Sequence, residues 1–103
     1  MSKQTMGILS ECIPIFTMLQ DESRQQILML LFDYKEMTVS EMTENLELSR
    51  PAVSHHMKLL LDAGLVSVKK NGKERIYSLN LQKTLERLKE LLLSIEADIK
   101  YDA

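Results

Sequence analysis

Two signals for the start of a helix stand a short distance apart in the middle of the chain. Thr38 and Glu41 have the spacing of a capping box, in which each side chain accepts a hydrogen bond from an otherwise unpaired backbone N–H. Ser49 is a suitable cap for a following helix, and Gly64 suits the left-handed conformation that ends one. The sequence therefore predicts two short helices joined by a tight turn, a helix-turn-helix over residues 39–64.

The spacing of apolar residues changes after residue 64 from a helical period to alternation. Val66 and Val68 precede Asn71-Gly72, and Tyr77 and Leu79 follow it. Because Asn-Gly favours a type I′ turn, this pattern predicts a β-hairpin over residues 65–79 with a two-residue loop. Such a loop aligns, in order from the tip, Lys70 with Lys73, Val68 with Arg75 and Val66 with Tyr77.

The rest of the chain has few residues that interrupt helices, with three glycines and two prolines in 103 residues. We therefore expect one domain over residues 1–103, mainly α-helical with a β-hairpin. A first helix over residues 6–19 is apolar around much of its circumference, and Pro14 inside it predicts a kink or a restart. Asp21 is expected to cap a second helix, whose apolar run over residues 27–32 marks it as central to the core.

The last helix, expected over residues 81–101 with Asn80 as its cap, carries apolar residues in alternating steps of four and three. These are Leu81, Leu85, Leu88, Leu92, Ile95 and Ile99. The pattern is a heptad seam, which is typical of a helix that packs against another helix. A second copy of the protein is one surface that would cover it.

Charge is unevenly distributed along the chain, although the formal net charge is only −2. Residues 49–79 carry a net charge of +4, and the remaining residues carry −6. The positive charge therefore lies on the second helix of the helix-turn-helix and on the hairpin, where it suits the phosphates of DNA.

The second helix of the helix-turn-helix separates apolar from polar residues. Its apolar residues Val53, Met57, Leu60 and Leu61 share one face, whereas Ser54, His55 and Lys58 point away from that face. Arg50 is a candidate for two hydrogen bonds to guanine, Ser54 and His55 for base edges, and Lys58 for a phosphate. An ordinary solvated face is the alternative, which the adjoining basic hairpin disfavours. The DNA-binding residues we expect are Ser49, Arg50, Ser54, His55, Lys58, Lys69, Lys70, Lys73 and Arg75.

The segment from Leu46 to Leu65, with its Ser-His-His-x-Lys core and Leu-x-x-Ala-Gly-Leu-Val ending, closely resembles the recognition region of the ArsR/SmtB family of bacterial winged-helix repressors. The segment from Leu19 to Leu28 is similar to the opening of the family's second helix. The lysine-rich hairpin matches the family's wing. The resemblance thus covers nearly the whole chain and implies a winged helix-turn-helix.

The resemblance also implies a cytoplasmic homodimer, built through the first and last helices, that represses transcription from a palindromic operator. Two recognition helices and two wings would then contact one duplex. The dimerisation residues we expect are Ile8, Cys12, Ile15, Leu85, Leu88, Leu92, Ile95 and Ile99. Neither the operator nor an inducer follows from the sequence.

Metal ligands known from this family are not expected here. Thr38-Val39-Ser40 occupies the place of a family Cys-x-Cys pair, and hydroxyls bind soft ions poorly. The last helix has four carboxylates but no histidine at the family's other site: Glu86, Glu90, Glu96 and Asp98. His55 and His56 point about 100° apart on their helix, so we expect a DNA contact at His55 and a packed His56. We expect no metal and no cofactor.

Other function classes have weaker support in the sequence. Cys12, the single cysteine, excludes a disulfide within the chain and favours a reducing compartment. It is more simply a small core residue than a thiol sensor, although a thiol-responsive regulator stays open.

A winged-helix adaptor that binds proteins rather than DNA is a further alternative, and a metal buffer is disfavoured. No catalytic motif and no membrane-spanning run stands out, so neither an enzyme nor a membrane protein is expected.

Overall fold

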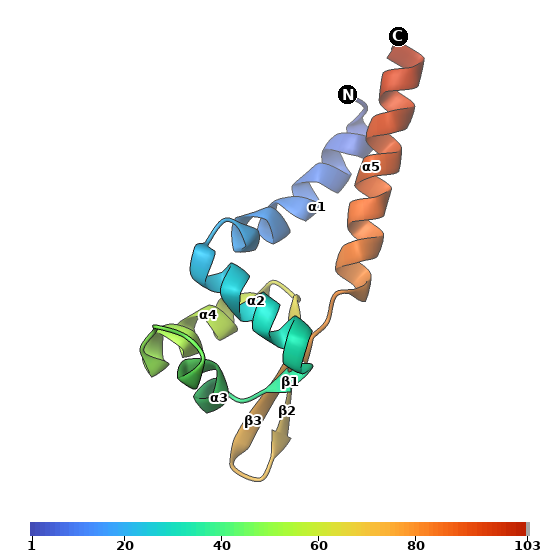
Figure 1. Ribbon diagram of the computed structural model, residues 1–103. Coiled ribbons are helices and arrows are strands. Elements are labelled where there is room, and N and C mark those ends of the chain that lie inside the picture. Colours follow the sequence, from blue (N-terminus) through green and yellow to red (C-terminus); the bar gives the residue numbers. More distant parts are fainter. Residues whose placement is uncertain (103) are drawn as a thin grey trace.

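The molecule has two ends of different character, a compact lower end and an extended pair of helices above it (Figure 1). The computed structural model describes residues 1–102, and Ala103, the last residue of the predicted domain, lies outside them. The elements, in chain order, are α1 (Lys3–Leu19), α2 (Glu22–Tyr34), β1 (Glu36–Met37), α3 (Val39–Glu44), α4 (Arg50–Asp62), β2 (Val66–Asn71), β3 (Glu74–Leu79) and α5 (Gln82–Asp102). We call residues 22–79 the core module, and α1 with α5 the helical arm. The fold is mainly helical with a β-hairpin, as the sequence predicts.

The caps predicted for the inner helices are confirmed. Thr38 and Glu41 form a complete capping box at the start of α3, and the Ser49 hydroxyl accepts a hydrogen bond from the N–H of Ala52 at the start of α4. Asp21 caps α2 by accepting from the N–H of Arg24. Gly64 follows α4 with a φ of +78°, a conformation that favours glycine. Local side-chain chemistry therefore sets the boundaries of these helices.

The hairpin forms, but its predicted register is wrong by two residues. Val68 pairs with Tyr77 and Lys70 pairs with Arg75, so Gly72-Lys73 is the loop. Gly72 has a φ of +66°, whereas Lys73 has no positive φ, which is the pattern of a type II′ turn. A shift of two residues keeps each side chain on its face of the hairpin. The apolar face is buried only at the base of the hairpin, at Val66 and Tyr77, because Val68 is 38% exposed.

A third strand, β1, was not predicted. Glu36 and Met37 pair antiparallel with Ser78 and Tyr77, which gives a sheet with the order β1-β3-β2. Two residues are too few to produce an alternating pattern, so the sequence carries no signal for this strand. The strand fixes the start of α3 to the edge of the wing.

The outer helices differ from expectation at their starts. Ser2 caps α1, which begins at Lys3 rather than at residue 6 and continues through Pro14 without a restart. Pro14 and Ser10, the residue whose carbonyl loses its N–H partner, are both exposed. Asn80 is not the cap of α5, because α5 starts at Gln82 and Leu81 lies between them. The N–H of Asn80 donates to the Leu65 carbonyl. Asn80 therefore closes the hairpin instead.

The core lies where α2, α4 and the sheet meet. Its fully or almost fully buried residues include Ile27, Leu31, Met42, Val53, Met57, Leu60 and Leu65. The apolar run of α2 is only partly central, because Met29 and Phe32 are 64% and 61% exposed. A helix that packs on one side buries one stripe only, so a continuous apolar run leaves some residues outside.

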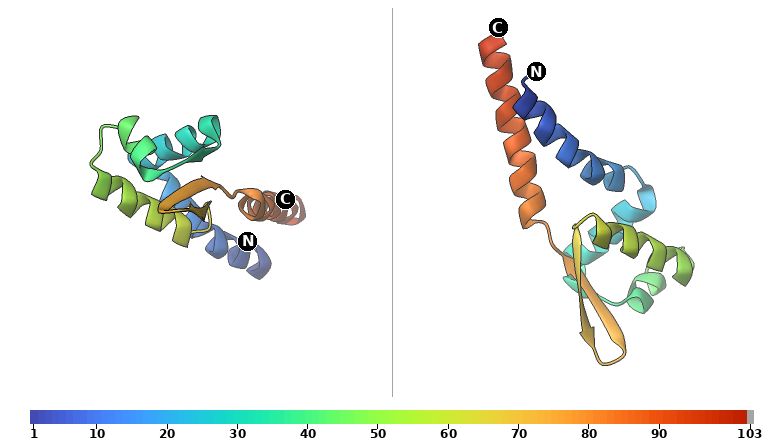
Figure 2. Two further views of the ribbon diagram at one scale, coloured as in Figure 1. Left: turned by 90° about the horizontal axis from the view of Figure 1, so that it is seen from below. Right: turned by 180° about the vertical axis from the view of Figure 1, so that it is seen from behind.

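The helical arm is formed by antiparallel packing of α1 against α5, which lie side by side near both chain termini (Figure 2). Contacts run in opposite order along the two helices. The Ser2 N–H donates to Asp98, the Thr5 and Ser94 hydroxyls bind each other, and Arg87 pairs with Glu11. Because of this arm the molecule is elongated, with extents of 54 × 25 × 21 Å. Within residues 1–102 no helix has the length and apolarity to cross a bilayer.

Candidate nucleic-acid interface

Helix α4 has the two faces that the sequence predicts. Val53, Met57 and Leu60 are 0% exposed and hold the helix against the core. Ser54, His55 and Lys58 are exposed. The helix therefore presents hydrogen-bonding side chains to the outside while its other face is fixed in place.

A groove with a volume of about 660 Å³ runs between α4, the start of α3 and the hairpin. It brings together residues that lie far apart in the sequence. Five of the nine predicted DNA-binding residues line it: Arg50, Ser54, Lys58, Lys73 and Arg75. The remaining four, which are Ser49, His55, Lys69 and Lys70, are exposed outside the groove lining. Asp62 and Glu74 also line the groove, so the groove is positive beside its basic residues and less so beside these two carboxylates.

Arg50 is held at the mouth of this groove by a neighbouring helix. Its guanidinium donates to the Ser40 hydroxyl over 2.8 Å. An arginine has five N–H donors, so this bond orients the guanidinium and leaves other donors for a ligand. Thr38 and Ser40 line the groove as well, and neither was predicted as a site residue. The sequence signal at both positions is the capping box, which indicates a helix start rather than a binding surface.

The basic residues of the hairpin have different surroundings. The ammonium of Lys69 lies 2.8 Å from a carboxylate oxygen of Glu36, so an exposed ion pair partly neutralises it. Lys70 stands opposite Arg75, and Lys73 occupies the loop. The observed register therefore puts Lys70 and Arg75 together near the tip, where the predicted register put Lys70 with Lys73.

The residues expected at a dimer interface fall into two groups. Leu85, Leu92 and Ile99 repeat every seven residues along α5 and are 51%, 61% and 63% exposed. Leu88 and Ile95 on the same seam, and Ile8 on α1, are half-buried. Cys12 and Ile15 differ from the expectation, because they are already buried within one chain. Apolar periodicity shows that a residue is covered, but not whether its own chain or a partner covers it.

Cys12 lies inside the contact between α1 and α5. Its thiol is 4.0 Å from the Arg87 carbonyl, and burial raises the pKa of the thiol above its usual value. Arg87 opposes this shift in the thiol pKa, and Glu11 and Glu90 add to it. Thiolate is the reactive form of cysteine, so these surroundings favour the role of a small core residue.

The two adjacent histidines have different environments. His55 is exposed on α4, whereas His56 is half-buried and faces Arg24 of α2. Across residues 1–102, no three histidine, cysteine, aspartate or glutamate side chains come close enough together to hold a metal ion.

Comparison with known proteins identifies the family of this chain. The model of the bacterial regulatory protein family arsR matches residues 21–68. The chain is 41% identical over 70 residues to an arsenical resistance operon repressor of Staphylococcus xylosus, and this match covers 68% of the chain and 66% of the relative. It is 35% identical over 66 residues to the transcriptional repressor SdpR of Bacillus subtilis, covering 64% of the chain and 72% of that relative.

A solved structure extends the likeness to the arm. The ArsR-like transcriptional regulator from Rhodococcus sp. RHA1 superposes with a TM-score of 0.79 and 30% sequence identity, over 94% of this chain and 87% of that one. The sequence match to the staphylococcal repressor spans just under two thirds of that relative's length. The winged helix-turn-helix expected from the sequence is confirmed, and the chain belongs to the arsR family of bacterial regulatory proteins.

Proposed function

We propose that this protein is a DNA-binding transcription regulator that grips a duplex with α4 and the hairpin. One observation carries the proposal. The groove between these elements gathers three α4 residues, Arg50, Ser54 and Lys58, with Lys73 and Arg75 from the wing. Base-reading and phosphate-binding side chains thus face the same space, as a protein that follows one strand of a duplex requires.

The proposed roles follow from side-chain chemistry and position. Arg50 and Ser54 stand on the first half of α4 and are suited to base edges in the major groove. Lys58, Lys73 and Arg75 carry the charge that neutralises phosphates, and Asp62 and Glu74 exclude phosphate from their own positions. His55 extends the reading surface beyond the groove.

We propose further that the protein acts as a homodimer on a palindromic operator. The exposed α5 seam, Leu85, Leu92 and Ile99, supports this step because a lone terminal helix gains nothing from exposed leucines in register. Two copies related by a twofold axis would place two copies of α4 on one face of the duplex. Repression of a promoter is the proposed outcome, because the relatives from Staphylococcus xylosus and Bacillus subtilis are named repressors. The proposed place of action is the nucleoid of a bacterial cytoplasm.

The proposed regulator does not read soft metal ions through the positions of the family's Cys-x-Cys pair. The Thr38 hydroxyl is engaged in the capping box, and the Ser40 hydroxyl accepts from Arg50. Both side chains therefore have structural partners, and neither is a thiolate. Any inducer of this regulator therefore acts at another part of the protein.

The test begins with selection of duplexes by the purified protein from a random-sequence pool. Lys73→Ala and Arg75→Ala should weaken binding to selected and random duplexes alike, each lowering the salt slope by about one unit. Arg50→Ala and Ser54→Ala should instead change sequence preference, by about 1 to 3 kcal/mol for each base-specific hydrogen-bonded pair that is removed. Lys89→Ala, an exposed charge on α5, is the matched control and should change neither property.

Two outcomes would contradict the proposal. A protein that enriches no sequence and binds genomic DNA only weakly would be better described as a protein-interaction adaptor. Equal losses on selected and random duplexes in all four groove variants would leave a DNA-binding protein without the assigned reading residues.

A further inference from the structure

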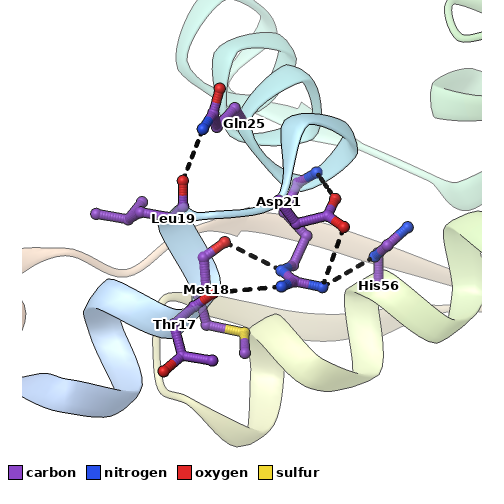
Figure 3. Close-up of polar contacts among 7 residues, drawn as sticks. Thr17, Met18, Leu19, Asp21, Gln25 and His56 are labelled. Atoms are coloured by element: carbon purple, nitrogen blue, oxygen red, sulfur yellow. Dashed lines mark hydrogen bonds and ion pairs between the residues drawn. The ribbon is translucent and has the colours of Figure 1, made fainter.

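Figure 3 shows the junction where α1 ends, α2 begins and α4 passes by, and the hydrogen bonds of Arg24 to Met18 and His56 place its side chain there. This side chain is 12% exposed. Nε donates to the Met18 carbonyl over 3.0 Å, Nη2 donates to the Thr17 carbonyl over 3.3 Å, and Nη1 lies 3.4 Å from Nδ1 of His56. One guanidinium therefore contacts the last turn of α1 and the middle of α4 at once.

The contacts with α1 are of the kind that a cation makes at a helix end. The last carbonyls of a helix have no N–H partner within it and carry the negative end of its dipole. Arg24 donates to two of them, those of Thr17 and Met18, and the Thr17 carbonyl also accepts from the N–H of Gln20. Asp21 accepts from the backbone N–H of Arg24, which holds the pKa of that carboxyl below its usual range, and lies 3.9 Å from the guanidinium.

The contact between Arg24 and α4 has a defined donor and a defined acceptor. Arginine only donates, so Nδ1 of His56 must be the acceptor, and the proton of the neutral ring then sits on Nε2. His56 stands between exposed His55 and buried Met57, so it sits at the edge between the reading face and the core face of α4. The planar guanidinium keeps a fixed angle between its N–H groups, and the bonds to α1 therefore restrict where His56 lies.

We propose that Arg24 is a positioning residue for DNA binding, which sets the orientation of α4 relative to α1 and hence relative to the helical arm. This inference rests on the proposed function. In a dimer joined through the arm, the angle between α4 and the arm decides the separation of the two reading helices. Arg24 thereby affects recognition of a two-part site without touching DNA.

The same junction offers a matched control. The side-chain amide of Gln25 donates to the Leu19 carbonyl over 2.7 Å, so Gln25 also joins α2 to the end of α1 (Figure 3). The partners of Gln25 in this junction do not include α4. Loss of Gln25 therefore weakens the junction while the tie to the reading helix stays in place.

The experiment compares Arg24→Gln, His56→Leu, the double variant, His56→Asn and Gln25→Ala. Binding is measured on a duplex selected by the wild-type protein and on a random duplex, at a temperature where circular dichroism shows every variant folded. Arg24→Gln and His56→Leu should each weaken binding to the selected duplex by about three- to tenfold and leave random binding unchanged. The double variant should be no weaker than the single variants, because both remove one connection.

The conservative variant separates positioning from simple loss of packing. The side-chain amide oxygen that His56→Asn introduces stands close to the place of the ring Nδ1, so this variant should keep selected binding near the wild-type level. Gln25→Ala should lower stability without changing the ratio of selected to random binding. In nitrogen-edited NMR spectra, the His56 ring should carry its proton on Nε2 in the wild type and lose that preference in Arg24→Gln.

Each contrary result has a definite meaning. Multiplicative losses in the double variant, or an equal loss in Gln25→Ala, would reduce Arg24 to a structural residue and overturn the inference alone. A His56 ring protonated on Nδ1 would remove the hydrogen bond itself and overturn the inference. A wild-type protein that selects no duplex would remove the proposed function and this positioning role together.

Discussion

The core module and the helical arm bury their residues in different ways. The core module buries ten apolar side chains, each at most 7% exposed, from α2, α3, α4, the three strands and Leu65. Between its two helices the described part of the arm encloses only Thr5, Cys12 and Leu91, and polar contacts such as Ser2 with Asp98 and Glu11 with Arg87 add to this packing. The first region builds a closed core within one chain and leaves only part of α2 uncovered, whereas the second exposes the apolar seam of α5.

This difference in packing indicates which region depends on a partner for its stability. A tightly packed apolar core stabilises its own elements, because its side chains are removed from water and pack closely against each other. Exposed ion pairs contribute little, so two long helices that enclose few side chains between them are only modestly stable alone. The arm is therefore expected to depend on a partner for stability, and the core module is not.

The largest expected effect compares one buried leucine from each region. Leu60→Ala should lower the free energy of unfolding by about 4 kcal/mol, because the residue is 0% exposed at the centre of the core. Leu91→Ala should cost about 2 kcal/mol, because Leu91 is near the surface of the arm, where neighbours can relax into the space. Urea unfolding followed by circular dichroism gives both values. Equal losses of unfolding free energy in the two variants would show that the arm is packed as tightly as the core and unfolds together with it.

The two regions also differ in how far the sequence predicts them. The boundaries of α2, α3 and α4 follow from neighbouring residues, such as Thr38 with Glu41, and these predictions are confirmed. The hairpin register was wrong because Asn71-Gly72 allows two placements of the loop, and pairing of Val66 with Leu79 decides between them. Such a choice depends on contacts across the sheet, which a local motif does not contain.

In the arm the limits of sequence reasoning are of another kind. The heptad pattern identified α5 as a packing helix, but Leu91, which widens the seam, is the residue that its own chain buries. Cys12 was expected to face a partner and instead faces Arg87. The sequence predicts the groove residues as a basic surface. It does not predict that Ser40 orients Arg50, because the Arg50 side chain reaches Ser40 across the turn between α3 and α4.

The second prediction concerns the exposed seam. Leu85→Asp combined with Leu92→Asp should leave the fold intact, since both leucines are more than half exposed, and should convert the proposed dimer into monomers. Binding to a selected palindromic duplex should then fall by about 100-fold, because the second half-site contact is no longer intramolecular. Sedimentation equilibrium and fluorescence anisotropy measure the two effects.

A matched variant limits how this result is interpreted. Leu93 is 66% exposed and points about 100° away from Leu92 around α5. Leu93→Asp should therefore disturb association less than the seam variant does. Unchanged sedimentation of the seam variant would remove the proposed interface, and a larger effect of Leu93→Asp would move it to another face of α5.

The third prediction uses Cys12 as a reporter for opening of the arm. The thiol is 0% exposed and burial raises its pKa, so it reacts only when α1 separates from α5 or the chain unfolds. An opening that costs about 2 kcal/mol would slow the reaction about 30-fold relative to the chain in urea. Timed reaction with a chromogenic disulfide measures the rate. A rate close to that of the unfolded chain would show an arm that is open in solution.

The smallest expected effect is the acid dependence of the contact between the two ends of the arm. The backbone N–H of Ser2 donates to Asp98, and this hydrogen bond is the main reason that the pKa of the Asp98 carboxyl lies below its usual range. A carboxyl whose pKa is lowered by folding stabilises the folded state above about pH 4, and this contribution is lost as the pH falls through the folded pKa. Thermal unfolding should therefore show Asp98→Asn less stable than the wild type at pH 7, with a smaller difference at pH 3. Asp21→Asn should show the same sign at the start of α2, because the N–H of Arg24 lowers the pKa of Asp21. A difference for Asp98→Asn that stays constant from pH 7 to pH 3 would mean that the Ser2 contact does not persist in solution, and that the arm is held near its termini by Thr5 and Ser94 alone.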